Sequence, residues 1–436
     1  MEGCFAFEGG MKMLQVLSSA WALLLGVCLL MVGNGLQGTM LGVRGELEGF
    51  STFQMSIVMA AYFVGFLGGS RLAPEMIRRV GHVRVFAALA SFISAVMILY
   101  PLLPNTIAWA LGRMIIGFCF SGVYVTAESW LNNAADNTNR GKALSLYMIV
   151  QTIGIIAAQM MIQIGDPAGY EAFIIASILV SVSFGPILLS ISPTPAFDTT
   201  KPMTLRQLFE TSPLGCVGMF LLGGVFSAQF GMSAVYGSAA GLTLWQLSVF
   251  VSTFYVGAML LQYPLGWLSD RMDRRFLILA AALAGGIGAV LGFLFGMEFK
   301  MLLVAAFFIG GLSNPLYSLL IAYTNDYLEH DDMAAASGGL IFINGLGAIA
   351  GPLITGWLME DAVFGPAGFF TFIGALMFAM AAYAAYRATQ RAAVPVDETG
   401  SFAAMSPTAT PVAVEFAQEY AIESELEEQE TAQETV

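Results

Sequence analysis

The sequence has few charged residues. They make up 11% of the 436 residues, whereas a soluble protein typically carries about 25%. Hydrophobic residues make up 57% of the chain, and the mean hydropathy is +0.76. This composition excludes an ordinary soluble globular protein and predicts a chain that is embedded in a membrane.

Cysteine and histidine are also scarce. The chain has four cysteines and two histidines: Cys4, Cys28, Cys119, Cys216, His82 and His330. The cysteines show neither the spacing of metal ligands nor the pattern of a disulfide framework. The sequence contains no nucleophile–histidine–acid set and no phosphate-cradling glycine loop. We therefore expect no catalytic residues, no metal, no cofactor and no nucleic-acid partner, so the chain is not expected to be an enzyme.

What the chain has in abundance is long apolar runs. A membrane-spanning helix needs about 20 apolar residues, and twelve runs approach that length. They lie at 14–42, 52–72, 84–103, 106–131, 143–165, 170–191, 214–240, 246–268, 276–297, 301–327, 335–358 and 366–386. The sequence thus predicts an all-α membrane protein with twelve transmembrane helices.

The basic residues fall in every second gap between these runs. Lys and Arg collect on the side of a membrane that is not translocated. With both termini in the cytoplasm, fourteen of the seventeen are cytoplasmic: Lys12, Arg71, Arg78, Arg79, Arg84, Arg140, Lys142, Lys201, Arg206, Arg271, Arg274, Arg275, Arg387 and Arg391. Only Arg44 and Lys300 lie on the other side, and Arg113 lies inside a run.

The chain repeats itself. Gln54-Met55-Ser56 opens the second run and Gln246-Leu247-Ser248 opens the eighth, with Gly65 and Gly257 following at the same offset of 192 residues. Two six-helix halves related by an axis along the membrane normal are expected from such a duplication. We divide the chain into a cytoplasmic N-terminal segment (1–13), a first half (14–191), a cytoplasmic connector (192–213) and a second half (214–390).

The remaining residues, 391–436, form an acidic tail. Ten of the acidic residues lie between Asp397 and Glu434, with no Lys or Arg among them. Such a composition predicts a disordered, solvated cytoplasmic extension. A short amphipathic helix from Val412 to Leu426 is the alternative.

Several short motifs carry a resemblance to a known family. Gly266-Trp267-Leu268-Ser269-Asp270-Arg271-Met272-Asp273-Arg274-Arg275 is similar to the signature Gly-x-x-x-Asp-Arg-x-Gly-Arg-Arg of the major facilitator superfamily, except that Asp273 replaces the second Gly. Tyr124-Val125-Thr126-Ala127-Glu128-Ser129-Trp130-Leu131-Asn132 and Arg140-Gly141-Lys142 resemble a bacterial branch typified by YcaD-type permeases. The resemblance implies a multi-pass protein of a bacterial inner membrane.

In this family the signature loop helps to lock the cytoplasmic gate. The resemblance therefore implies gating roles for Asp270, Arg271, Arg274 and Arg275, and for Arg78, Arg79 and Gly81 in the first half. The first half has Arg78 where the family has the acid. A standard lock is therefore not expected on that side.

A substrate site is expected near the middle of the membrane. Arg113, Gly117, Ser121, Tyr124 and Glu128 are spaced so that they share one face of a helix. An Arg inside hydrocarbon must face protein or water, and no acid lies at its depth in another run. Its partner is thus expected among backbone carbonyls, Asn34, Gln37 or a bound anion.

The predicted substrate-binding set combines Arg113 and Tyr124 with polar residues of other glycine-interrupted or bent runs. These further residues are Asn34, Gln37, Gln229, Asn314 and Tyr317. Helix-to-helix packing is the alternative role for the polar residues of the first and seventh runs, and the alternative for Arg113 is a structural Arg held by backbone carbonyls. Tyr62, Gln151, Tyr255, Gln262 and Asn344 are secondary lining candidates.

Glu128 is the candidate proton-coupling residue, because a carboxyl group in a cavity can take and release a proton. Its alternative role is an anchor that is bonded to Trp130 or to the loop at Arg140.

Together these features predict a monomeric secondary active transporter that moves a small organic solute or drug by alternating access. Its partners would be that solute, membrane lipid and a coupling proton. The alternatives are a membrane sensor or scaffold that signals through the acidic tail, and a lipid translocase.

Overall fold

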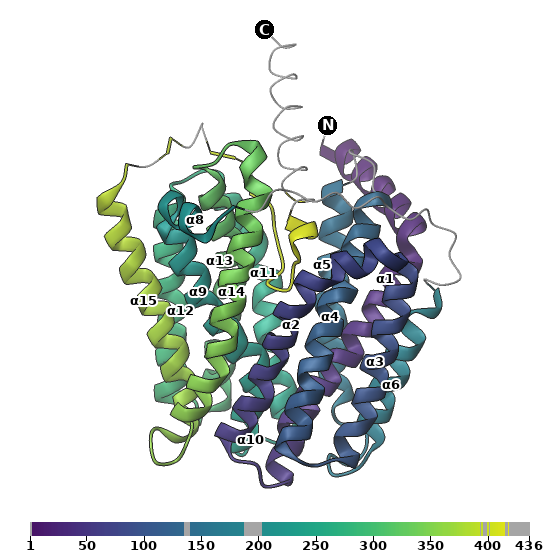
Figure 1. The fold of residues 1–436 in the computed structure, drawn as a ribbon. Helices are drawn as coiled ribbons and strands as arrows, with labels where there is room; N and C mark the ends of the chain where they lie inside the picture. Colours follow the sequence, from purple (N-terminus) through teal and green to yellow (C-terminus); the bar gives the residue numbers. More distant parts are fainter. Residues whose placement is uncertain are drawn as a thin grey trace.

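The computed structural model describes residues 2–134, 140–186, 203–392, 394–395, 399–400, 402–414 and 417. Helices make up 84% of the structure, and the described residues contain no strand. Figure 1 shows the helices packed side by side in one bundle, with the start of the first helix and the end of the last long helix at the same end.

The helices follow the predicted runs in order. The first half contains α1 (Glu2–Leu47), α2 (Thr52–Val80), α3 (His82–Leu102), α4 (Thr106–Ala134), α5 (Arg140–Met161) and α6 (Glu171–Ser183). The second half contains α9 (Pro213–Ser227), η2 (Ala228–Met232), α10 (Ser233–Ala239), α11 (Leu244–Ser269), α12 (Arg274–Phe295), α13 (Phe299–Asn325), α14 (His330–Leu358), η3 (Gly365–Ala367) and α15 (Gly368–Gln390). A short helix, α8 (Leu205–Thr211), lies in the predicted connector.

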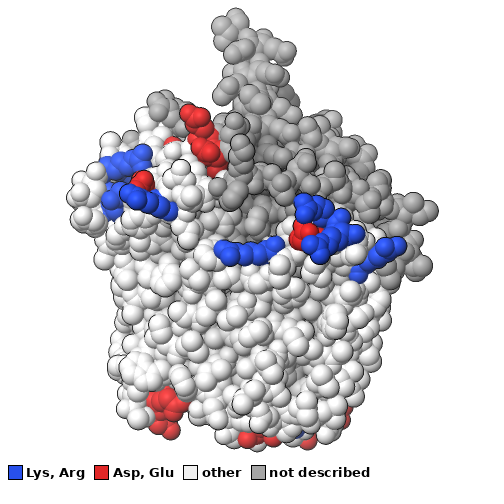
Figure 2. Space-filling view, viewed as in Figure 1, with Lys and Arg blue, Asp and Glu red and all other residues white. Residues whose placement is uncertain are grey.

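The predicted fold class is confirmed. Eleven helices in the described residues are long and apolar enough to cross a membrane, and the shorter apolar helix α6 corresponds to the sixth predicted run. In Figure 2 the Lys and Arg side chains gather toward the end at which α1 begins and α15 ends, and a nearly uncharged band separates them from acidic side chains at the other end. We call these the basic end and the opposite end.

The sequence repeat is also a structural repeat. Ser51 caps α2, where its hydroxyl accepts from the backbone N–H of Gln54 at 3.1 Å and the Gln54 side chain accepts from the backbone N–H of Ser51 at 2.9 Å. Thr243 and Gln246 form the same capping box at the start of α11, at 3.3 and 3.0 Å. The two boxes are 192 residues apart, so corresponding helices begin in the same way.

Glycines allow the same helix crossing in both halves. In the first half, a Cβ atom on Gly65 would collide with the carbonyl oxygen of Met114, and one on Gly117 with that of Tyr62. In the second half, Gly257 lies in the same way against Phe307 and Gly310 against Phe254. Only glycine permits such close approach of two helix backbones, so α2 crosses α4 as α11 crosses α13.

The two glycine-interrupted helices, in contrast, differ from each other. α1 is a continuous α-helix that begins at Glu2, so the predicted N-terminal segment 1–13 is continuous with the first span. The seventh span is divided into α9, the five-residue π-helix η2 and α10. A π-turn is a wide turn that often marks a functional place in a helix.

Candidate functional site

A cavity of about 740 Å³ lies between the two halves. Polar lining residues come from both halves: Asn34, Thr39, Tyr62, Arg113, Tyr124, Gln151, Gln159, Gln229, Tyr255, Gln262 and Asn314. Apolar and aromatic side chains, including Met31 and Phe230, fill the wall between them. A few polar groups in a largely apolar cavity are typical of a small-molecule site.

Arg113 is a buried basic side chain in the wall of this cavity. It is 5% exposed, and its Nη1 donates to Oε1 of Gln37 at 3.2 Å. Its guanidinium carbon lies 4.7 Å from the centre of the Tyr62 ring, which is a cation–π contact. Gln37 is therefore the partner that was expected among several options, whereas Tyr62 was not predicted in this role.

The positive charge of Arg113 has no acidic partner among the described residues. Its Nε has no hydrogen-bond partner there either. A buried cation with unused donors favours an approaching anion or carbonyl group. The arrangement can thus hold a negatively charged group at the cavity wall.

The structure divides the other predicted substrate residues. Asn34, Tyr124, Gln229 and Asn314 line the cavity together with Arg113. Gln37 does not line it and acts only through Arg113.

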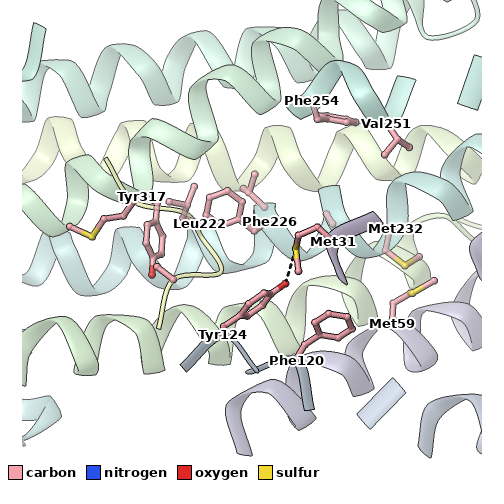
Figure 3. Close-up of a cluster of buried hydrophobic side chains, with 14 of the residues drawn as sticks. Met31, Met59, Phe120, Tyr124, Leu222, Phe226, Met232, Val251, Phe254 and Tyr317 are labelled. Carbon is pink, nitrogen blue, oxygen red and sulfur yellow. Dashed lines mark hydrogen bonds between the residues drawn. The ribbon is translucent and has the colours of Figure 1, made fainter. Parts of the chain in front are cut away.

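Tyr317 lies away from the cavity, in the core. It is fully buried, and its ring packs edge-on against Phe226 with ring centres 6.0 Å apart. Figure 3 shows Tyr317 with Phe226 and Leu222, whereas the Tyr124 hydroxyl donates to Sδ of Met31 at 3.5 Å. The two tyrosines are 193 residues apart, yet only Tyr124 lines the cavity.

The secondary lining candidates also fall into two groups, those that line the cavity and one that does not. Tyr62, Gln151, Tyr255 and Gln262 line the cavity. Asn344 is absent from its wall, because its amide donates to the backbone oxygen of Met219 at 3.0 Å and joins α14 to α9.

Sequence reasoning missed Thr39 and Gln159, which line the cavity and hydrogen-bond to each other at 3.0 Å. A polar side chain in each of two apolar spans was the only signal that could have indicated them.

Glu128 lies beside this cavity and is 2% exposed. Its carboxylate accepts from the hydroxyl of Tyr147 at 3.4 Å and from the backbone N–H of Thr410 at 3.2 Å, and the Thr410 hydroxyl also donates to it. Trp130 is not its partner, since the indole N–H makes no hydrogen bond among the described residues. The Arg140 side chain lies outside the described part of the chain.

Arg274, a predicted gating residue, organises the basic end of the second half. It forms a buried ion pair with Asp326, which follows α13, and donates to Ser269 at 3.1 Å and to the backbone oxygen of Ala322 at 3.3 Å. Asp270 lies 3.6 Å away. The signature loop therefore ties α11, α12 and α13 together.

Asp273 has a structural role, although it departs from the family signature. It caps α12, accepting from the backbone N–H of Arg275 at 3.0 Å, and binds the Arg275 guanidinium at 2.7 Å. Partial burial opposes ionisation, but these hydrogen bonds prevail and lower the pKa of Asp273. Arg271 lies over the Trp267 ring and lines the cavity with Asp270.

The basic end of the first half is built differently. Arg78 and Arg79 both pair with Glu75 on their own helix, and all three side chains are substantially exposed. Gly81 ends α2 at a φ of +86°, which favours glycine, and begins the turn into α3. The described residues of this half contain no counterpart of the Arg274–Asp326 pair.

The tail differs from the expectation of a solvated extension. Phe402, Ala403, Ala404, Met405, Ser406, Pro407 and Thr408 line the cavity, and Thr410 is buried beside Glu128. Figure 1 shows this yellow segment between the halves at the basic end. Residues 411–414 are helical and overlap the start of the alternative short helix, Val412 to Leu426, whereas 418–436 lie outside the described residues.

At the opposite end the halves contact each other directly. The hydroxyl of Thr52 donates to Glu360 at 3.2 Å and to the backbone oxygen of Gly356 at 3.3 Å. The backbone N–H of Phe53 also donates to Glu360, at 3.0 Å. The start of α2 is thereby joined to the end of α14 and the loop that follows it.

Comparisons with solved structures agree with this architecture. The structure of the nucleoside transporter NupG superposes with a TM-score of 0.69 at 14% identity, covering 84% of this chain and 98% of that one. A bacterial homologue of the human lysosomal transporter Spinster, in an inward-facing, unoccupied conformation, superposes with a TM-score of 0.63 at 14% identity, covering 94% and 98%. These likenesses show the fold.

Sequence comparisons identify the family. The MFS-type transporter YcaD of Escherichia coli O6:K15:H31 (strain 536 / UPEC) is 24% identical over 343 residues, which cover 78% of this chain and 88% of the relative. The protein of the same name from Escherichia coli O7:K1 (strain IAI39 / ExPEC) is 25% identical over 346 residues, with the same coverage. The model of the Major Facilitator Superfamily matches residues 23–252 and 215–414. The chain therefore belongs to the Major Facilitator Superfamily of membrane transporters.

Proposed function

We propose that the protein is a secondary active transporter that moves a small organic anion across a bacterial inner membrane by alternating access. The observation that carries this proposal is Arg113, a buried cation at the wall of the central cavity with no acidic partner among the described residues. The basic end is assigned to the cytoplasm because Lys and Arg collect on that side.

The cavity wall also suggests what else the solute carries. Amide side chains of Asn34, Gln151, Gln229 and Asn314 offer both donors and acceptors. The Tyr62 ring beside Arg113 provides an aromatic surface. A solute with one carboxylate or phosphate and several hydrogen-bonding groups fits this set.

The proposal is tested with a panel of matched solutes on the purified full chain. Each carboxylate or monophosphate is compared with its neutral amide or alcohol, first by thermal stabilisation and then by flux in proteoliposomes. We expect the anions alone to stabilise the protein. If neutral members stabilise it equally well, the role given to Arg113 is wrong.

Two variants address Arg113 without removing its charge. Arg113→Lys keeps the charge but loses the forked donors, and Gln37→Glu places a fixed carboxylate beside the guanidinium. Both should weaken anion binding by about tenfold or more, the value of a charge-assisted hydrogen bond. Arg78→Gln, an exposed cation far from the cavity, is the matched control and should bind normally.

Proton coupling through Glu128 is a further part of the proposal. The carboxyl group is buried between α4, α5 and the tail, and no basic side chain among the described residues pairs with it. Glu128→Gln should abolish solute accumulation driven by a pH gradient while exchange of solute across the membrane continues. Glu75→Gln is the control. Unchanged gradient-driven accumulation in Glu128→Gln would rule out the role.

A sensor that signals through its tail remains the second candidate, because residues of the tail line the cavity in which solute would bind. A chain that ends at Arg391 separates the two functions. A transporter still moves the solute after this truncation, whereas a tail-dependent sensor loses its output.

A further inference from the structure

The described tail residues occupy the space between the halves at the basic end, and they contact both halves. On the second half, the backbone N–H of Phe402 donates to Asp270 at 2.8 Å, and that of Met405 donates to the hydroxyl of Ser318 at 2.9 Å. On the first half, Thr410 donates to Glu128 through its backbone N–H and its hydroxyl.

The contacts of Met405 and Thr410 are buried, whereas that of Phe402 with Asp270 is exposed. Met405 is 4% exposed and Thr410 is 1% exposed. The Phe402 ring lies against Gly266, where a Cβ atom would come within 2.7 Å of it. Polar backbone groups that are buried and hydrogen-bonded in this way are costly to leave unpaired, so the segment is held in a defined place.

Its position conflicts with the movement of solute. Residues 402–408 line the same cavity as Arg113, and Figure 1 shows their segment at its basic end. At the opposite end the halves contact each other through Thr52, Phe53 and Glu360. Solute that leaves the cavity toward the basic end would therefore have to pass the tail.

The position also conflicts with the rocking of the halves. Alternating access changes the separation of the halves at each end in turn. Because the segment bonds to Asp270 and Ser318 on one half and to Glu128 on the other, that separation cannot change unless one set of bonds breaks.

We propose that residues 402–414 form an autoinhibitory plug that seals the basic end of the cavity and holds the two halves together until it is displaced. This inference rests on the proposed transport function for its consequence, but the plug itself is measurable without any solute. Within the plug, Thr410 and the backbone of Ala413 bind Glu128 of the first half, and Phe402 and Met405 bind the second half.

The first experiment measures access to the cavity. Ala258, on α11, lines the cavity and takes no part in the proposed solute contacts. A single cysteine is placed there (Ala258→Cys) after the native cysteines are replaced by alanine, and it is labelled with a membrane-impermeant maleimide in detergent. We expect labelling to be at least about tenfold faster in a chain that ends at Arg391 than in the full chain, a coupling of typical size. Equal rates would overturn the plug.

A matched pair of point variants covers the case in which truncation disturbs folding. Thr410→Val removes the hydroxyl that donates to Glu128, whereas Thr408→Val removes one that contacts only Ser406 within the tail. Labelling at position 258 should be faster in Thr410→Val and unchanged in Thr408→Val. The same rate in both variants would contradict the proposal.

A cross-link tests the position of the plug in the full chain. A Cβ atom at position 266 would lie 3.5 Å from Cγ of Phe402, so Gly266→Cys with Phe402→Cys is within range of a disulfide. Oxidation should form the bond, detected as a linked peptide by mass spectrometry, and should stop flux until reductant is added. Absence of the linked peptide would show that the segment lies elsewhere. If labelling and cross-linking succeed but no solute is transported, the plug stands and the transport proposal fails.

Discussion

The two halves of this protein share a fold but differ in how their buried charged residues are paired at the basic ends. α3 and α12 begin with residues that are 192 positions apart, His82 and Arg274. Arg274 forms a buried ion pair with Asp326, whereas the buried ring of His82 stacks on Trp130 with ring centres 6.3 Å apart. The buried acid of the first half, Glu128, has no such basic partner among the described residues and accepts hydrogen bonds from Thr410 of the tail.

This difference shows how duplicated halves acquire separate tasks. The second half closes its own basic end with a salt bridge between its helices. The first half has a cavity cation, Arg113, with no acidic partner among the described residues, and a buried acid, Glu128, that accepts hydrogen bonds from the distant Thr410. In the proposed mechanism the first half therefore supplies both the solute-binding cation and the proton-coupling acid, while the tail contacts both halves.

The largest effect is expected from breaking the second half's ion pair. Asp326→Asn leaves the buried Arg274 with only the more distant and exposed Asp270 as its counter-charge, which should lower the free energy of unfolding by up to about 3–5 kcal/mol. Denaturant unfolding of the purified protein measures the change. The double variant Asp326→Asn with Arg274→Met restores a neutral site and should recover part of the loss. If the single variant is as stable as the parent, the Arg274–Asp326 ion pair contributes nothing to the free energy of unfolding.

The glycine crossings test whether the halves pack alike. Gly65→Ala and Gly257→Ala each force a Cβ atom against a carbonyl oxygen of the neighbouring helix, and overpacking of this kind costs about 1–3 kcal/mol. Both variants should lower the unfolding midpoint. Gly338→Ala, where a Cβ atom meets nothing within 4 Å, is the control. A loss in only one half would show that the crossings are not equivalent.

Loss of the neutral Gln229–Ser313 pair should lower the free energy of unfolding less than loss of the Arg274–Asp326 ion pair. Gln229 and Ser313 exchange hydrogen bonds of 2.9 and 3.2 Å in a buried position. Ser313→Ala leaves the Gln229 amide unsatisfied and should cost about 1–3 kcal/mol, measured by the same unfolding assay. Ser313→Thr keeps the hydroxyl and should retain more of the stability; if it is as damaging as alanine, packing rather than the hydrogen bond is responsible.

The smallest effect is expected at the exposed charges of the first half. Glu75 pairs with Arg78 and Arg79 at the protein surface, and such surface pairs contribute little. Glu75→Gln should leave the unfolding midpoint unchanged within error at physiological salt. A clear decrease would mean that the first half also has a structural lock at this end.

The sequence was sufficient to predict the class of fold. Long apolar runs, alternating basic gaps and the 192-residue offset are local or periodic signals, and each predicted run corresponds to a helix. Arg113 and its partner Gln37 were also within reach, because a buried cation without an acid at its depth leaves few candidates.

The contacts that distinguish the halves were not predictable in this way. The ion pair of Arg274 with Asp326 joins residues 52 positions apart, and the bond between Glu128 and Thr410 spans 282. Neither leaves a periodic trace in the chain. The tail was also misleading, because the acidic residues that dominate its composition say little about its small apolar residues, of which Met405 and Ala413 are buried.

The π-turn at Ala228–Met232 has a consequence for how this chain tolerates change. A wide turn holds one residue more than the α-helical turn it replaces, so it has the form of a single-residue insertion accommodated within a helix. Deleting one residue here would restore an ordinary turn, whereas the same deletion in α1 would rotate every later side chain of that helix by about 100°. The seventh span can thus accommodate the loss of one residue at this turn, and such a deletion would change the direction in which Gln229 points relative to the cavity.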